Sequence, residues 1–332
     1  MKRGFYTIMA AQFFSSLADN ALLIAAIFLL KDMQAPEWMP PLLKWCFTLS
    51  YVVLAAFVGA FADSMPKGKV MFVTNLVKIA GCGLLFLHVH PLVAYAVVGF
   101  GAAAYSPAKY GILTELLPAE KLVAANGWIE GLTVMSIIFG TVLGGALIKP
   151  TLIAPLLEFD LPLIDTGIDS TAKVALLIIT LIYILGALFN LRIPDTGARY
   201  EHQAHTPHKL IADFAHCFMV LWRDRLGQIS LAVTTLFWGA GATLQFIVLK
   251  WAGVNLGMEL AEATIMQGIV ALGVALGAVA AARFVPLKKS LTVMPMGIAM
   301  GVIVMLMVFI HNVWLAYPLL VIVGALSGFF VV

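Results

Sequence analysis

Stretches of about twenty consecutive and mostly apolar residues recur along this chain, and a transmembrane helix needs about that length to cross a bilayer. We place ten of them, at residues 6–30, 44–62, 70–88, 92–113, 123–147, 173–191, 228–249, 263–283, 291–310 and 313–332. Only 11% of the residues are charged, against about 25% in a soluble domain. The chain therefore lacks the polar surface of a soluble globule, and the sequence predicts an all-α polytopic membrane protein.

One long polar stretch interrupts the series of spans. It divides the chain into an N-terminal six-helix bundle at residues 1–191, a linker at 192–227 and a C-terminal bundle of four spans at 228–332. One helical face of the linker collects its apolar residues, Leu210, Phe214, Cys217, Phe218 and Leu221. This spacing predicts an amphipathic helix that lies on the membrane surface.

Lysine and arginine residues are distributed unevenly over the loops. Thirteen fall on the side of the N-terminus and five on the other side, and every arginine belongs to the first set. Because cytoplasmic loops carry the excess of these residues, we expect the N-terminus to lie in the cytoplasm. Only Lys78 and Lys109 remain inside spans.

The loop between the second and third spans reads Gly-Ala-Phe-Ala-Asp-Ser-Met-Pro-Lys-Gly-Lys. It resembles the G-x-x-x-D-x-x-x-[RK]-G-[RK] loop of the major facilitator superfamily, and it lies in the same place. The matching residues, which we interpret as a cytoplasmic gate, are Gly59, Asp63, Lys67, Gly68 and Lys69. In such a gate the acid meets a helix N-terminus, while the lysines pair with acids or lipid phosphate. The resemblance implies two six-helix bundles with the substrate site between them, the last two helices being missing from this chain.

Four ionisable residues lie within the spans of the first bundle: Asp19, Lys78, Lys109 and Glu130. A charge at membrane depth costs at least roughly 2.5 kcal/mol and is tolerated mainly where it faces a cavity or a partner. Lys109 and Glu130 have similar depths on consecutive spans, so they form either a structural pair or separate sites, with Lys109 reaching lipid phosphate. Asp19 lies deep and precedes Asn20, which favours headgroup or ion binding. We expect Asp19→Asn to cripple transport and to spare folding.

The spans of the second bundle contain no charged residue in their interiors, only a few polar and aromatic ones. A cavity with charges on one wall and apolar groups on the other suits an amphipathic substrate. The candidate substrate-binding or ion-binding residues are Asp19, Asn20, Lys78, Tyr105, Lys109, Glu130, Trp238 and Gln245.

Residues 105–113 read Tyr-Ser-Pro-Ala-Lys-Tyr-Gly-Ile-Leu, and Glu-Leu-Leu-Pro follows at 115–118. The pattern K-L-V-x-A-N-G-x-x-E comes next at 121–130, with Ala-Asp-Asn-Ala-Leu-Leu at 18–23 and Phe-Trp-Gly-Ala-Gly at 237–241. These segments are similar to the bacterial lysophospholipid transporter family. The segment that joins the fourth and fifth spans is the most specific of them.

This resemblance implies a secondary transporter, and not an enzyme. It would move lysophosphatidylethanolamine and lysophosphatidylglycerol from the outer to the inner leaflet of the bacterial inner membrane. A cytoplasmic acyltransferase/acyl-carrier-protein synthetase would then reacylate them. The family suggests a coupling ion, Na⁺ or H⁺, and no further cofactor, metal or nucleic acid.

Two rival functions remain open. A multidrug or metabolite antiporter of the same superfamily would use Asp19 or Glu130 as its proton carrier, and the glycines of the fifth span favour it, whereas the fourth-span motif argues against it. A membrane-embedded acyltransferase would need a catalytic base at the interface, and no histidine lies in the interior of a predicted span, since His88, His90 and His311 lie at outer helix ends.

A lysolipid is already dissolved in the outer leaflet, and drawing its acyl chain through water would cost about 0.8 kcal/mol per methylene. Sideways entry is cheaper. We therefore expect an outward-open state with a lateral opening between the bundles near the fifth and eighth spans. Gly140, Gly144, Gly273 and Gly277 would keep side chains small along that opening.

Overall fold

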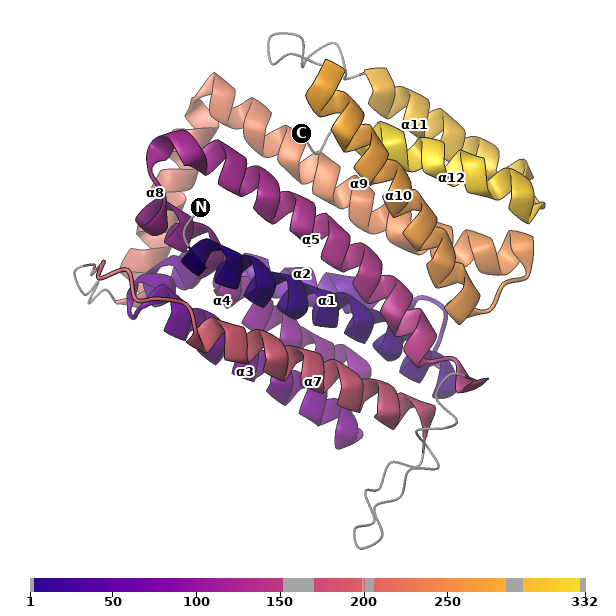
Figure 1. Cartoon of the computed structure of the whole chain (residues 1–332), viewed down its shortest axis with the longest axis horizontal. Coiled ribbons are helices and arrows are strands. Elements are labelled where there is room, and N and C mark those ends of the chain that lie inside the picture. The colour runs from indigo at the N-terminus through magenta and orange to yellow at the C-terminus, as the bar shows by residue number, and fades with distance from the viewer. Residues whose placement is uncertain (1–2, 152–169, 199, 201–205, 285–294, 329–332) are drawn as a thin grey trace, which may run out of the picture.

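The computed structural model describes residues 3–151, 170–198, 200, 206–284 and 295–328, and the regular elements in these ranges are helical (Figure 1). They are α1 (Arg3–Asp32), α2 (Met39–Asp63), α3 (Lys67–Phe86), α4 (Pro91–Leu116), α5 (Ala119–Leu147), α7 (Thr171–Leu191), α8 (Pro207–Arg223), α9 (Arg225–Leu256), α10 (Leu260–Phe284), α11 (Pro295–Leu306), the short 3-10 helix η2 (Met307–Phe309) and α12 (Val313–Gly328).

Each of the ten predicted spans coincides with one of these helices, the ninth with α11 and η2 together. Within the described ranges, six helices are long and apolar enough to cross a membrane: α1, α2, α3, α4, α7 and α10. The amphipathic segment expected in the linker is α8. The apolar periodicity therefore located the helices correctly, because length and hydrophobicity are the properties that a bilayer selects.

Helix α1 is the centre of the first helix group, which we define as α1–α5 and α7. It packs against α2, α4, α5 and α7, while α3 packs against α4 and α7. A helix in such a position is apolar all round, and residues Ala21 to Ala26 of α1 are all buried. The polar side chains of α1 therefore need partners on neighbouring helices.

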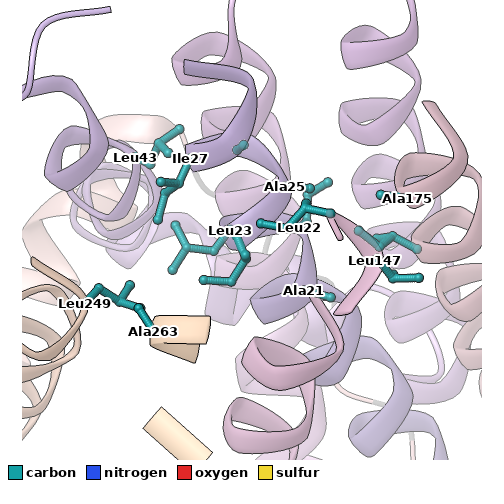
Figure 2. Close-up of a cluster of buried hydrophobic side chains, with 14 of the residues drawn as sticks. Ala21, Leu22, Leu23, Ala25, Ile27, Leu43, Leu147, Ala175, Leu249 and Ala263 are labelled. Carbon is teal, nitrogen blue, oxygen red and sulfur yellow. The ribbon is translucent and has the colours of Figure 1, made fainter. Parts of the chain in front are cut away.

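The second helix group consists of α9–α12, in which α10 packs closely against α12. The two groups meet mainly through α5 and α10. Figure 2 shows part of the shared core, where Leu23 of α1 and Leu147 of α5 lie in one cluster with Leu249 of α9 and Ala263 of α10. This core lies at the end of the molecule where α1 ends and α10 begins, which we call the far end. The N-terminus and the α2–α3 loop lie at the opposite, near end (Figure 1).

The four glycines assigned to a lateral opening between the groups pack within their own groups instead. A Cβ atom on Gly144 would lie 2.8 Å from the backbone oxygen of Ala21 in α1, and Gly140 also faces α1. In the second group, a Cβ atom on Gly273 would lie 2.2 Å from the backbone oxygen of Val321, and Gly277 also faces α12. The assignment of these glycines was wrong because spacing along a helix does not reveal which neighbour it touches. The opening itself concerns another state and stays a prediction.

We expect Gly273→Val to reduce the yield of folded protein, since the new side chain would force apart α10 and α12, which are in close backbone contact at this position. Gly301→Val in α11 is the matched control, because nothing lies within 4 Å of a Cβ atom at that position. Size-exclusion chromatography of the two purified variants measures the difference. Equal monodisperse yields would contradict the packing described here.

Candidate functional site

Asp19 and Lys78 form an ion pair inside the first helix group. The Lys78 ammonium donates to Asp19 Oδ2 at 2.7 Å, and the exposed fractions of the two side chains are 2% for lysine and 12% for aspartate. Ser15, one turn before Asp19 on the same face of α1, accepts a second hydrogen bond from Lys78 at 2.9 Å. Two charges in a low-dielectric interior need this pairing, because either one alone would be strongly unfavourable.

Tyrosines from two further helices complete the surroundings of the ion pair. Tyr183 of α7 donates from its hydroxyl to Asp19 Oδ1 at 2.7 Å, so both carboxylate oxygens are bonded. Tyr95 of α4 donates to the backbone oxygen of Asp19 at 3.2 Å. The ring centre of Tyr105 lies 5.1 Å from the Lys78 ammonium, a distance at which the ring face attracts a cation. Four helices thus converge on one charged pair.

The polar network extends from the pair along α3 and α7. Ser15 donates to Asn75 Oδ1 at 2.7 Å, while Asn75 Nδ2 is buried and has no hydrogen-bond partner within the described residues. Further towards the near end, Asn190 donates to the backbone oxygen of Met71 at 3.1 Å and accepts from the Tyr105 hydroxyl at 3.4 Å.

Four residues of this network were not predicted from the sequence: Asn75, Tyr95, Tyr183 and Asn190. Their signal was periodicity among polar residues: Asn75 precedes Lys78 by three positions, and Asn190 follows Tyr183 by seven. Residues at these spacings share one helical face. Tyrosine and asparagine are common at helix ends and interfaces, so this signal became specific only once the helix contacts were known.

The structure brings together three of the predicted site residues, Asp19, Lys78 and Tyr105. Asn20 points elsewhere: it donates to the backbone oxygen of Ser16 at 2.8 Å, and it faces Gly140 of α5. In α9, Gln245 is buried, its side-chain nitrogen lacks a partner within the described ranges, and its backbone oxygen accepts from Gln267 at 2.6 Å.

Three predicted site residues remain: Lys109, Glu130 and Trp238. Lys109 is 8% exposed, and its ammonium lies 4.3 Å from the ring centre of Tyr110. The side chains of Glu130 and Trp238 lie outside the described part of the chain. The proposed Lys109–Glu130 pair therefore stays a prediction.

The predicted gate loop forms a second charged cluster, at the near end. Lys67 pairs with Asp63, donates to the backbone oxygen of Ala62 at 3.0 Å, and lies 3.9 Å from Glu115 Oε1. Glu115 belongs to the end of α4, and the sequence analysis gave it no role. Gly68 packs closely against Ile193, because a Cβ atom at position 68 would lie only 3.1 Å from Cβ of Ile193. Lys69 is exposed, and Gly59 has open space beside it.

The segment after α7 folds back over this cluster. Tyr200 donates to Glu115 Oε1 at 2.9 Å and Thr196 donates to Oε2 at 2.5 Å, while the Tyr200 ring centre lies 4.6 Å from the Lys67 ammonium. The hydrogen bond to Glu115 raises the pKa of Tyr200, as do partial burial and the nearby acids. Glu115 therefore fastens the start of the linker to the gate loop.

The sequence of this chain is similar to those of known membrane transporters. Residues 8–332 match the model of the Major Facilitator Superfamily. The chain is 41% identical to the lysophospholipid transporter LplT of Yersinia enterocolitica, an alignment that covers 100% of this chain and 78% of that protein. The chain belongs to the lysophospholipid transporter family. The transporter of Serratia proteamaculans is 40% identical over 100% of this chain and 79% of its own length.

A solved structure shows the same fold without close sequence similarity. It is a bacterial homologue of the human lysosomal transporter Spinster in an inward-facing and occupied conformation, with a TM-score of 0.64 and 15% identity, covering 98% of this chain and 72% of that one. The expected major facilitator fold is confirmed. The family consists of transporters, so the expectation that the chain is not an enzyme is also confirmed.

For this family member we expect Glu115→Gln to loosen the linker without unfolding the protein. The amide keeps the shape of the side chain, but it removes the charge that holds Lys67 and the strong acceptors that hold Tyr200 and Thr196. Limited trypsin digestion between the two helix groups should become faster. Glu37→Gln is the matched control, since Glu37 pairs with Lys250 at an exposed position in the far end. Identical digestion of both variants would show that Glu115 does not fasten the linker.

Proposed function

We propose that this protein carries lysophosphatidylethanolamine and lysophosphatidylglycerol from the outer to the inner leaflet of a bacterial inner membrane. The observation that carries the proposal is the 41% identity over the whole chain to a lysophospholipid transporter. A cytoplasmic acyltransferase/acyl-carrier-protein synthetase would reacylate the delivered lipid. The lysine and arginine distribution supports a cytoplasmic N-terminus, which makes the near end cytoplasmic and the far end the outer one.

The division of charge between the helix groups supports an amphipathic substrate. The interior of the first group holds Asp19, Lys78 and Lys109, whereas the buried polar side chains described in the second group are uncharged, Gln245 and Thr264. A lysolipid presents a charged headgroup and a single acyl chain. The first group would bind the headgroup, and the apolar second group would accept the chain.

The Asp19–Lys78 pair is almost buried, with 12% of the Asp19 side chain and 2% of the Lys78 side chain exposed, so we expect helix movement to admit a headgroup to it. A zwitterionic phosphoethanolamine offers one phosphate for Lys78 and one ammonium for Asp19, and it could therefore replace the internal pair with two new pairs. Such an exchange keeps both buried charges compensated throughout. We propose that it links headgroup binding to the rearrangement of α1 against α3.

Contacts between the groups indicate which side is open. The core shared by both groups lies at the far end, whereas the core at the near end, around Phe5, Ile112 and Ile129, contains residues of the first group and linker only. Lys250 of α9 also pairs with Glu37 beyond α1, at 3.0 Å. This hydrogen bond lowers the pKa of Glu37. The pair is therefore fully formed at every pH above the ordinary pKa of a glutamate, and it is lost as the pH falls through the lowered pKa. We infer a state that is closed outside and faces the cytoplasm.

Uptake of labelled lysophosphatidylethanolamine tests the proposal in cells that lack their own lysolipid transporter. Cells with the cytoplasmic acyltransferase should convert the label to the diacyl lipid, and cells without it should accumulate unmodified lysolipid in the inner leaflet. Acylation without that partner would show an enzyme instead. Resistance to toxic compounds without lysolipid movement would show a multidrug antiporter.

A further inference from the structure

Helix α8 has two chemically different faces. At about 100° per residue, six of its large apolar side chains fall within about 120° of the helix circumference, while Met219 and Val220 lie outside this arc. These are Leu210, Ile211, Phe214, Phe218, Leu221 and Trp222. The opposite face carries two basic residues, Lys209 and Arg223, together with His216 and one acid, Asp213. This division is sharper than in the described spans, which are apolar on most sides.

The apolar face of α8 is uncovered by the rest of the protein. Phe214, Phe218 and Trp222 are 45%, 48% and 51% exposed, and no residue of α8 is buried. The rings of Phe218 and Trp222 stack with their centres 5.9 Å apart, which makes one continuous apolar surface. Large exposed patches of this kind mark a contact with another protein or with a membrane.

The corner between α8 and α9 fixes where this surface lies. A single residue, Asp224, separates the two helices, and its side chain accepts a hydrogen bond from the backbone nitrogen of Gly227 at 2.8 Å. Gln228 donates to the backbone oxygen of Trp222 at 2.7 Å. A Cβ atom on Gly227 would lie only 2.2 Å from the backbone oxygen of Leu221, so the corner is tightly packed. The predicted span at 228–249 belongs to α9 and begins directly after this corner, which places α8 at the membrane surface.

Contacts with both helix groups agree with this position. Helix α8 packs against α2 as well as α9, and Figure 1 shows it at the near end of the molecule. Its apolar face is therefore at the level where the acyl chains of the cytoplasmic leaflet begin. Lys209 and Arg223 lie at the level of the lipid headgroups, where a cytoplasmic leaflet with anionic lipids attracts basic side chains.

We infer that α8 is a lipid-binding helix: its apolar face inserts into the cytoplasmic leaflet, and its basic face binds anionic headgroups. The partner is the lipid surface itself, rather than a transported lipid, so the inference stands independently of the proposed substrate. Amphipathic helices with a basic polar face lie in the interface in this way. The leaflet would then hold the corner before α9 at a fixed depth while the helix groups move.

Spin labels on the two faces of α8 test the inference in the full chain. The background carries Cys46→Ser and Cys217→Ser and keeps Cys82, which is buried. Single cysteines replace Phe218 on the apolar face or His216 on the opposite face, and the protein is reconstituted into phosphatidylethanolamine/phosphatidylglycerol vesicles. The label at 218 should collide with oxygen more than with a water-soluble nickel chelate, and the label at 216 should show the reverse. Ile211→Cys provides a second apolar position if the first variant folds poorly.

Lipid charge gives an independent measurement. In the 218-labelled protein, Lys209→Gln together with Arg223→Gln should reduce the depth of the label in these anionic vesicles and leave it unchanged in pure phosphatidylcholine. Two results would overturn the inference. Frequent collision of the 218 label with the nickel chelate would place the apolar face in water. Protection from both quenchers would mean that another protein surface covers it, either a second copy or a cytoplasmic partner.

Discussion

Asp19→Leu and Lys78→Met should each abolish lysophospholipid uptake and destabilise the protein, while the double variant should recover stability but not uptake. Either single change leaves one charge buried without its partner, which costs about 3–5 kcal/mol in buried pairs. Replacing both members with apolar side chains removes that penalty. Uptake of labelled lysolipid and the thermal unfolding temperature in detergent measure the two effects separately.

The double variant decides between a structural and a functional role. If Asp19 and Lys78 only hold α1 against α3, the double variant should transport as the wild type does. If they also bind the headgroup, transport stays lost although the fold is restored. Tyr183→Phe is a milder control, since it removes one hydrogen bond to Asp19 and keeps both charges. The expectation that Asp19→Asn spares folding is replaced by this one, because it did not include the ion pair with Lys78.

The sequence predicted the helices of this protein better than their contacts. Span positions and the amphipathic linker helix follow from apolar length and periodicity, which are local properties. The pairing of Asp19 with Lys78 depends on how α1 and α3 are rotated towards each other, and a single sequence fixes the depth of a residue but not that rotation. The sequence analysis therefore considered Lys109 and Glu130 as partners and gave Tyr183 no role.

The gate loop illustrates the same limit at the membrane surface. Its motif identified Asp63 and Lys67 from spacing alone, because both belong to one short segment. Glu115 and Tyr200 come from the end of α4 and from the linker, and only the fold brings them to Lys67. The motif is thus one part of a larger cluster that joins the linker to the first helix group.

Gly145 and Thr264 lie in close contact where the two helix groups meet at the far end. A Cβ atom on Gly145 of α5 would lie 1.9 Å from the Thr264 hydroxyl oxygen and 2.8 Å from its Cβ atom. Rotation of the threonine side chain relieves the first contact but not the second, because Cβ is fixed to the backbone. Any side chain at position 145 therefore keeps α5 and α10 apart.

We expect Gly145→Val to yield folded protein that cannot close its outer end, and to slow lysolipid uptake by more than about tenfold, the effect of 1.4 kcal/mol on a rate. Ala263, which is 1% exposed beside Thr264, reports closure when it is replaced by cysteine in a Cys46→Ser background. A membrane-impermeant maleimide added outside should label this cysteine several-fold faster in the Gly145→Val variant than in its parent, which opens outside only during part of its cycle.

The neighbouring glycine provides the matched control for this prediction. Gly144→Val places its side chain against Ala21 and Ile24 of α1, within the first helix group, and should lower the folded yield rather than expose position 263. A second change tests the mechanism: Thr264→Gly removes the atoms that the new valine side chain would meet, so it should restore much of the lost uptake. Glycine has a lower helix propensity than threonine, so the double variant should be slightly less stable. Wild-type uptake in Gly145→Val, with position 263 still protected, would mean that α5 and α10 need not approach this closely during transport. The outer closure would then depend on the other contacts of the shared core, around Leu249 and Trp251.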